Sequence, residues 1–186
     1  MGNFVQFHFK LVKPMKKLFA LAIVIFMIGC TVKNPEIKLP AVISDNMVLQ
    51  QNKQVNLWGW SVPKAKITVE ASWGKSAEAV TGADGKWMAQ LETPAAGGPF
   101  SVTIKSGETE KLINNVMVGE VWLCSGQSNM EMPLKGWPPN DTINFSASEI
   151  ASSDYPGIRM FTVTKSTAAA PLDDCNGTWV VSSPAT

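Results

Sequence analysis

Short runs of alternating apolar and polar residues recur between positions 37 and 115, and they limit what this part of the chain can form. A period of two places every second side chain on the same face of a strand. Strands spaced by about ten residues, with turn residues between them, are typical of a small antiparallel sandwich or barrel. We therefore predict a β-sandwich-like domain over residues 37–115, with a hairpin turn at 83–85. The predicted strands are 55–60, 66–71, 86–91 and 100–105.

The pattern changes near position 116. Residues 116–124 form a nearly continuous apolar run, which suits a strand buried on both faces, as in a parallel sheet covered by helices. A short helix is predicted at 142–153 and a second strand at 158–163. Strand, helix and strand in this order are typical of the start of an α/β domain. Two or three strands do not complete such a core, so we expect residues 116–186 to hold only part of one.

A single histidine, His8, limits the chemistry that the sequence can support. We expect His8 to be removed with a leader, and the remaining chain then has no imidazole. That excludes a Ser/His/Asp triad, a His-based zinc site and a His general base within this chain. The 16 Lys and Arg residues nearly balance 15 Asp and Glu residues, so composition shows no nucleic-acid-binding surface.

An N-terminal leader is indicated by an 11-residue apolar run at 18–28, which follows Lys16 and Lys17. The run is too short to cross a bilayer as a helix but has the length of a signal-peptide core. Residues 27–30, Met-Ile-Gly-Cys, resemble a bacterial lipobox with Cys30 as the lipidated first residue. The alternative is an ordinary secretory signal with a nearby cysteine.

The leader predicts where the mature chain acts. We expect residues 1–29 to be a signal peptide, with Met15 as a better start than Met1. Removal of the signal peptide takes away four lysines, so the remaining chain has 12 basic and 15 acidic residues and a net charge of −3. Such a chain is not expected to seek nucleic acid or an anionic membrane surface. We expect an exported lipoprotein of the bacterial periplasm or outer membrane, held at the membrane only by lipid on Cys30.

A candidate nucleophile follows the apolar run at 116–124. Ligands bind at the carboxyl ends of strands in open α/β sheets, and Ser128 lies just past the predicted strand end. Gly126 permits a sharp turn and a close approach of substrate, and the Ser128 amide can donate to an oxyanion. The alternative is a polar turn, because short motifs often match by chance. The spacing alone favours that alternative.

Several stretches together resemble the sialate O-acetylesterases, which are carbohydrate esterases of the SGNH hydrolase superfamily. The longest is 118–134, Val-Gly-Glu-Val-Trp-Leu-Cys-Ser-Gly-Gln-Ser-Asn-Met-Glu-Met-Pro-Leu, which resembles the nucleophile block of that family. The resemblance covers roughly residues 37–184 and shifts the interpretation of Ser128 towards a nucleophile. Shorter matching stretches lie at 39–41, 44–51, 58–60, 83–87, 96–99 and 156–161.

The resemblance implies a fold and a reaction. The fold is a β-rich, sandwich-like N-terminal domain followed by the truncated start of an α/β/α SGNH hydrolase domain. In the reaction, Ser128 attacks an acetyl ester on a sugar, and its amide helps to form the oxyanion hole with a later Gly and a later Asn. A histidine in a later Asp-x-x-His block acts as base, and no metal or cofactor is needed. Those later blocks are absent from this chain, so we expect it to have little or no esterase activity alone.

Residues beside Ser128 are weaker candidates for contacts with substrate. Gln127, Asn129 and Glu131 could line the site, although an exposed loop charge such as Glu131 needs no function. Cys124 and Cys175 could form a disulfide in an exported protein. We favour two buried thiols, because Cys124 lies inside the predicted strand.

A non-catalytic alternative is a surface-anchored β-sandwich that binds carbohydrate. Trp58, Trp60, Trp73 and Trp87 could form a sugar-stacking platform, but core packing explains them equally well, and we favour the core. We interpret Asn46 and Gln50, within the family-like stretch 44–51, as structural turn or strand residues. A truncated, poorly folded product without function is a third possibility.

Overall fold

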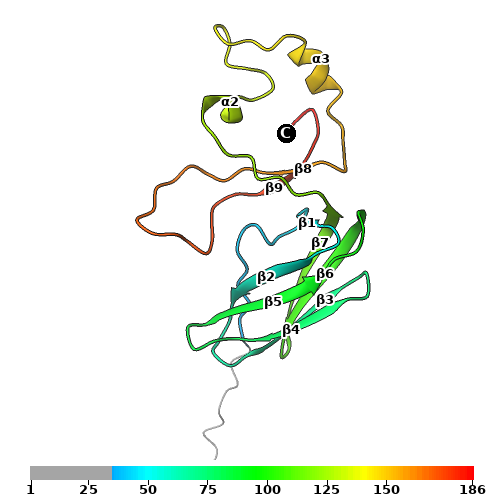
Figure 1. Cartoon of the computed structure of the whole chain (residues 1–186), viewed down its shortest axis with the longest axis vertical. Helices are drawn as coiled ribbons and strands as arrows, with labels where there is room; N and C mark the ends of the chain where they lie inside the picture. The colour runs from blue at the N-terminus through cyan, green and yellow to red at the C-terminus, as the bar shows by residue number, and fades with distance from the viewer. Residues whose placement is uncertain (1–34) are drawn as a thin grey trace, which may run out of the picture. The chain divides into compact units, whose positions relative to one another are not determined.

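A computed structural model describes residues 35–186 of the chain. The predicted signal peptide 1–29, the alternative start Met15 and the lipidation site Cys30 lie outside the described residues. Residues 35–119 form a β domain, and residues 120–186 form a C-terminal segment with little regular structure (Figure 1). The β domain contains β1 (Val48–Gln50), β2 (Gln54–Trp60), β3 (Lys66–Ala71), β4 (Ser76–Val80), β5 (Lys86–Glu92), β6 (Gly97–Ser106) and β7 (Thr109–Gly119).

Two sheets make up the β domain. The larger has the strand order β1-β7-β6-β3-β4, and the smaller pairs β2 with β5 (Figure 1). Neighbouring strands are antiparallel except β1, which lies parallel to β7. The four predicted strands are confirmed as β2, β3, β5 and β6, while the sequence analysis missed β1, β4 and residues 109–115 of β7.

Alternation along the strands builds a single core in the β domain. In β5 the inward residues Trp87, Ala89 and Leu91 are buried, while the residues between them are exposed. Alternating buried residues of β3, β6 and β7 join the same apolar cluster. Burial of this apolar surface is the main stabilising term for a small sandwich.

The turn at 83–85 forms, but it does not join a hairpin. Gly85 has a φ of +80°, which an L side chain rarely adopts, and the Asp84 carboxylate accepts a hydrogen bond from the Lys86 amide at 3.1 Å. The strands on either side of the turn belong to different sheets, since β4 pairs with β3 and β5 pairs with β2. The turn therefore carries the chain from one sheet to the other.

The predicted strand at 116–124 is wrong beyond Gly119. Residues 116–119 are the end of β7, and residues 120–127 have no regular secondary structure. Trp122 is 82% exposed and Leu123 is 95% exposed. The ladder ends at Gly119 because its parallel partner β1 ends at Gln50, directly opposite. No strand or helix among residues 35–186 covers the apolar side chains that follow.

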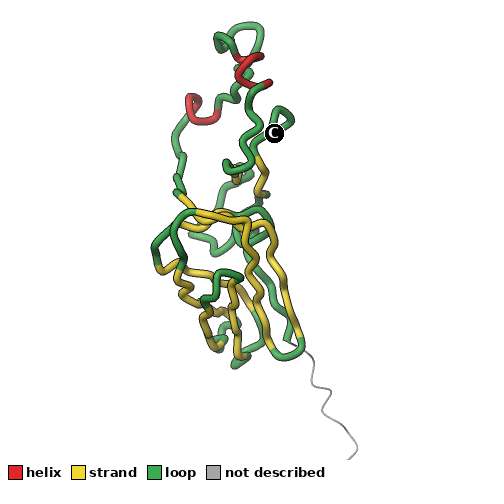
Figure 2. The backbone as a smooth tube through the Cα atoms, turned by 90° about the vertical axis from the view of Figure 1, so that its right-hand side faces the viewer, coloured by secondary structure: helices red, strands yellow, loops and turns green. Residues whose placement is uncertain are grey.

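The C-terminal segment is mostly loop (Figure 2). Its elements are α2 (Ser128–Glu131), α3 (Ser146–Ala151), β8 (Arg159–Phe161) and β9 (Trp179–Val181). The predicted helix and second strand are thus present in shortened form. β8 pairs antiparallel with β9 in a separate two-stranded sheet, so the parallel sheet of an SGNH domain is not confirmed.

Several hydrogen bonds connect residues 159–179 to the β domain. The Trp179 indole donates to the Val42 carbonyl at 2.8 Å, and the Asp174 carboxylate accepts from the Ala41 amide at 2.9 Å. The Arg159 guanidinium donates to the Asn115 side chain at 3.2 Å.

None of the helices within 35–186 is long and apolar enough to span a membrane.

Candidate functional site

Ser128 is the first residue of α2, a single helical turn. The Gln127 carbonyl accepts hydrogen bonds from the Met130 amide at 2.9 Å and the Glu131 amide at 3.2 Å. The Ser128 carbonyl accepts from the Met132 amide at 2.9 Å, and the turn ends there before Pro133. We call residues 121–131 the Ser128 segment.

Gly126 lies close to the turn that follows it. A Cβ atom at this position would lie 2.7 Å from Cγ of Met130 and 3.3 Å from its Cβ. A larger side chain would push Met130 aside and disturb the turn that presents Ser128. The small size of glycine thus fits the contact with Met130, and the predicted close approach of substrate stays a prediction.

The Ser128 hydroxyl has no activating partner among residues 35–186. Ser128 is exposed, and its hydroxyl makes no hydrogen bond within the described part of the chain. No histidine occurs after His8. A serine hydroxyl without an adjacent base is a weak nucleophile. The described residues therefore provide a candidate nucleophile without its base.

The three predicted neighbours of Ser128 are exposed. Gln127 and Asn129 make no side-chain hydrogen bond within residues 35–186. The Glu131 carboxylate forms an ion pair with the Lys165 ammonium group, which lies on the loop after β8. This pair directs Glu131 towards the later loop, and whether any of the three contacts substrate stays a prediction. No cluster of three or more metal-ligating side chains occurs among the described residues.

Cys124 and Cys175, the two cysteines within residues 35–186, are free thiols, and the predicted burial of Cys124 is wrong. Cys124 is exposed and Cys175 is partly buried. Cys124 is exposed because residues 120–127 leave the sheet at the end of β7.

The tryptophans do not share one exposed face. Trp87 is 3% exposed and lies in the core, as predicted. Trp58 and Trp60 alternate with the buried residues of β2 and so lie on its opposite face. The Trp58 indole donates to the Asp173 carbonyl at 3.1 Å, and Lys38 Nζ lies 5.1 Å from the centre of the Trp60 ring. Trp73 packs edge-on against Phe100.

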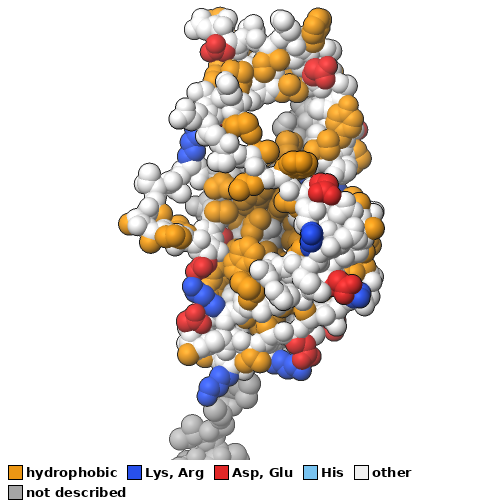
Figure 3. Space-filling model, in the orientation of Figure 1, with side chains coloured by type: hydrophobic (Ala, Val, Ile, Leu, Met, Phe, Trp, Pro, Cys, Tyr) orange, Lys and Arg blue, Asp and Glu red, His pale blue; other side chains and the backbone are white. Residues whose placement is uncertain are grey.

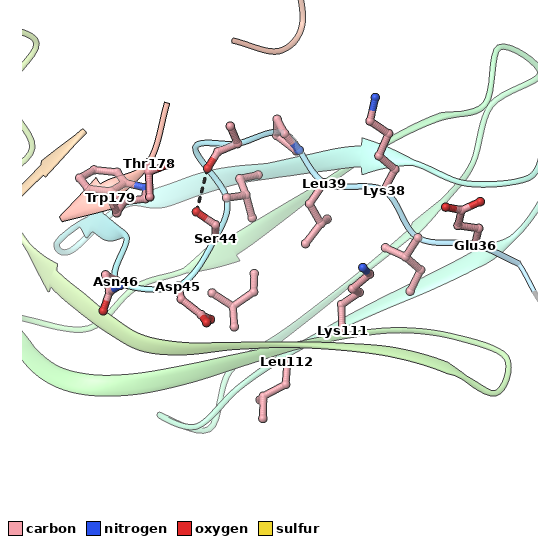
Figure 4. A pocket seen from close by; sticks show the side chains of 15 residues that line it. Glu36, Lys38, Leu39, Ser44, Asp45, Asn46, Lys111, Leu112, Thr178 and Trp179 are labelled. Carbon is pink, nitrogen blue, oxygen red and sulfur yellow. Dashed lines mark hydrogen bonds between the residues drawn. The ribbon is translucent and has the colours of Figure 1, made fainter. Parts of the chain in front are cut away.

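A shallow pocket that Ser128 does not line lies at the edge of the β domain (Figure 4). Its labelled polar side chains carry both charges, with Lys38 and Lys111 near Glu36 and Asp45. It contains no histidine or cysteine, so it offers no evident nucleophile–base pair.

Apolar side chains are also exposed over the C-terminal segment (Figure 3). They include Val121, Trp122, Leu123, Phe145, Tyr155, Ile158, Val163 and Leu172.

The sequence analysis missed a polar cluster where the Ser128 segment leaves β7. The Glu120 carboxylate accepts hydrogen bonds from the side chains of Gln50 at 3.0 Å and Gln51 at 2.7 Å. These bonds, the one from Gln50 foremost, lower the pKa of Glu120 below its ordinary value. The available signal was the Gln50-Gln51 pair in the family-like stretch 44–51, where Gln50 was assigned a structural role.

Comparison with solved structures finds a carbohydrate acetylesterase that resembles this chain. A carbohydrate acetylesterase from Xanthomonas citri superposes with a TM-score of 0.74 at 34% sequence identity, over 81% of this chain and 33% of its own. No model of a known protein family matches the chain.

Sequence comparison finds relatives among the sialate O-acetylesterases. The sialate O-acetylesterase of Rattus norvegicus is 31% identical over 150 residues, which cover 75% of this chain and 27% of the relative. The human sialate O-acetylesterase is 29% identical over 147 residues, 74% of this chain and 27% of the relative. The chain is therefore homologous to the sialate O-acetylesterases, and the resemblance is confirmed. It spans about a quarter of the length of these curated relatives.

Proposed function

We propose that this chain supplies the nucleophile-bearing part of a carbohydrate O-acetylesterase whose catalytic domain is of the SGNH type. The observation that carries the proposal is the homology to acetylesterases, which extends over most of the chain. It is supported by Ser128 itself, which follows Gly126 at the start of a helical turn and is exposed to solvent.

The proposed reaction has two steps. The Ser128 hydroxyl oxygen attacks the acetyl carbonyl carbon, and the sugar oxygen leaves as an alcohol after it takes a proton. Water then attacks the acetyl-serine, which releases acetate and restores the hydroxyl. The Ser128 amide is proposed as one oxyanion donor, and Gln127, Asn129 and Glu131 remain candidate contacts to the sugar.

The proton transfers need a base that the described residues lack. In the family that the chain resembles, a histidine of an Asp-x-x-His block has this role, and this sequence contains no such block. We therefore propose that residues 35–186 alone hydrolyse acetyl esters at a rate close to background. Acetylated sugars are proposed as substrates because the homologues are acetylesterases of sialate and carbohydrate.

A chimera tests the proposal. The third of the Xanthomonas citri acetylesterase that matches this chain is replaced by residues 35–186, and acetate release from O-acetylated sugars is measured. We expect hydrolysis in the chimera and a loss of at least about a hundredfold in Ser128→Ala, because the nucleophile is removed. Ser125→Ala is the matched control, since Ser125 is an exposed serine on the same approach to α2. Hydrolysis that survives Ser128→Ala contradicts the assignment.

We also propose export and lipid attachment at Cys30, on the basis of Lys16, Lys17 and the apolar run at 18–28. Radiolabelled palmitate should label the chain expressed in a Gram-negative host, and Cys30→Ala should abolish both the label and partition into detergent. Secretion of an unlabelled chain would support the ordinary signal peptide instead. The sugar-stacking alternative gains no support, because the tryptophans that it requires do not form one exposed platform.

A further inference from the structure

The direction in which the Ser128 segment leaves the β domain depends on few contacts. β7 ends at Gly119, and residues 121–127 are exposed and lack regular secondary structure. Strand pairing therefore cannot hold these residues. The first contacts after β7 that can set the direction of the segment are those at Glu120 and Val121.

Two neighbouring glutamines supply those contacts. Each oxygen of the Glu120 carboxylate accepts one hydrogen bond, Oε2 from Gln50 at 3.0 Å and Oε1 from Gln51 at 2.7 Å. The Gln50 side-chain oxygen accepts from the Val121 amide at 2.9 Å.

The Gln51 side chain is anchored in turn. Its oxygen accepts a hydrogen bond from the Ala96 amide at 2.9 Å, and its backbone amide donates to the Gly119 carbonyl at 2.8 Å. Each glutamine thus uses both its donor and its acceptor. A glutamine amide offers a donor and an acceptor, and an ionised carboxylate offers two oxygens to meet the two donors.

These side-chain bonds are separate from the backbone pairing of the β1–β7 ladder. That ladder pairs Val48 with Met117, Leu49 with Val118 and Gln50 with Gly119 through the backbone. The glutamine side chains instead reach residues beyond the last paired position, where the chain has already left the sheet.

We propose that Gln50, Gln51 and Glu120 form a clamp that positions the Ser128 segment relative to the β domain. The three are positioning residues that act through the backbone at Val121. The role in positioning a nucleophile rests on the proposed function, but the clamp itself can be tested without any activity.

Hydrogen exchange of the full chain, read by NMR, is the first test. We expect Gln50→Ala to speed exchange of the Val121 amide about fivefold or more, since its acceptor is lost. Gln51→Ala should lower the heteronuclear NOE of residues 121–127, while amides of β5 stay unchanged. Gln90→Ala is the matched control, because Gln90 is an exposed glutamine on β5 that bonds only to Asn56, at 3.3 Å. Unchanged exchange and NOE values in both clamp variants would overturn the proposal.

A charge variant separates the clamp from simple packing. Gln50→Glu keeps an acceptor for the Val121 amide but places a second carboxylate beside Glu120, with Lys53 as the nearby positive charge. We expect the protection factor of Val121 to fall at pH 7 and to recover as the pH drops and one of the two carboxylates takes a proton. Equal loss of protection at both pH values would indicate packing and contradict the clamp.

The acetylesterase chimera adds a catalytic measurement. There, Gln50→Ala should lower kcat about fivefold with little change in KM, because a displaced nucleophile slows the chemistry rather than the binding. A wild-type KM and kcat in a chimera that depends on Ser128 would overturn the positioning role. If Ser128→Ala leaves hydrolysis intact, the proposed function fails while the exchange results still decide the clamp.

Discussion

Replacement of Gly59 by alanine should strongly destabilise the β domain. Gly59 is buried in β2, and a Cβ atom there would clash with the backbone carbonyl oxygen of Lys38 and would lie 3.0 Å from the Trp87 ring. Neither group can move freely. Lys38 exchanges two backbone hydrogen bonds with Trp60, each of 2.9 Å, and Trp87 is in the core.

The magnitude follows from these contacts. Overpacking a core by a methyl group costs about 1–3 kcal/mol. Displacing Lys38 adds up to two lost hydrogen bonds at about 1 kcal/mol each. The reduced entropy of the unfolded chain offsets about 0.4–1 kcal/mol. We therefore expect a net loss of about 2–4 kcal/mol in the free energy of unfolding.

Thermal unfolding followed by far-UV circular dichroism measures this loss. For a domain of this size, each kcal/mol corresponds to about 4–8 °C, so Gly59→Ala should lower the melting temperature by at least about 8 °C. Gly157→Ala is the matched control, because no atom lies within 4 Å of its added Cβ. If Gly59→Ala melts with the wild type, the steric argument is refuted.

Two further predictions concern contacts between the β domain and the C-terminal segment. Trp179→Phe removes the hydrogen bond to the Val42 carbonyl and should cost about 1–2 kcal/mol in urea unfolding, with faster exchange in β9, whereas unchanged exchange would contradict the anchoring role. A hydrogen bond from Lys86 to Asp173, at 2.5 Å, raises the pKa of Lys86 above 10.5. Because the folded pKa is raised, the stability from this exposed pair is complete below pH 10.5 and is lost as the pH rises through the folded value. Asp173→Asn should therefore lower the Lys86 pKa in an NMR titration and remove this part of the pH dependence, and an unchanged Lys86 pKa would contradict the pairing.

Strands with strong local alternation could be predicted from the sequence. β2, β3, β5 and β6 carry apolar residues at every second position, and that contrast is visible without any partner. β4 was missed because its inward residues are alanines, which contrast weakly with their neighbours. β1 was missed because it is three residues long and exists through its parallel pairing with β7.

The end of β7 illustrates the opposite limit. The run 116–124 is apolar throughout, so composition alone predicts one continuous strand. The strand instead stops at Gly119, where its partner β1 ends. A strand end is set by the partner's length, and no local pattern encodes that length.

For the candidate site, the sequence predicts the type of chemistry. It offers Ser128 in a family-like stretch as the candidate nucleophile, and it contains no histidine after His8. The contacts of Gln50 and Gln51 with Glu120, and of Glu131 with Lys165, could not be predicted and are seen in the three-dimensional structure. Residue types and their alternation are local properties. Hydrogen bonds between residues about seventy positions apart depend on which strands pair and where they end.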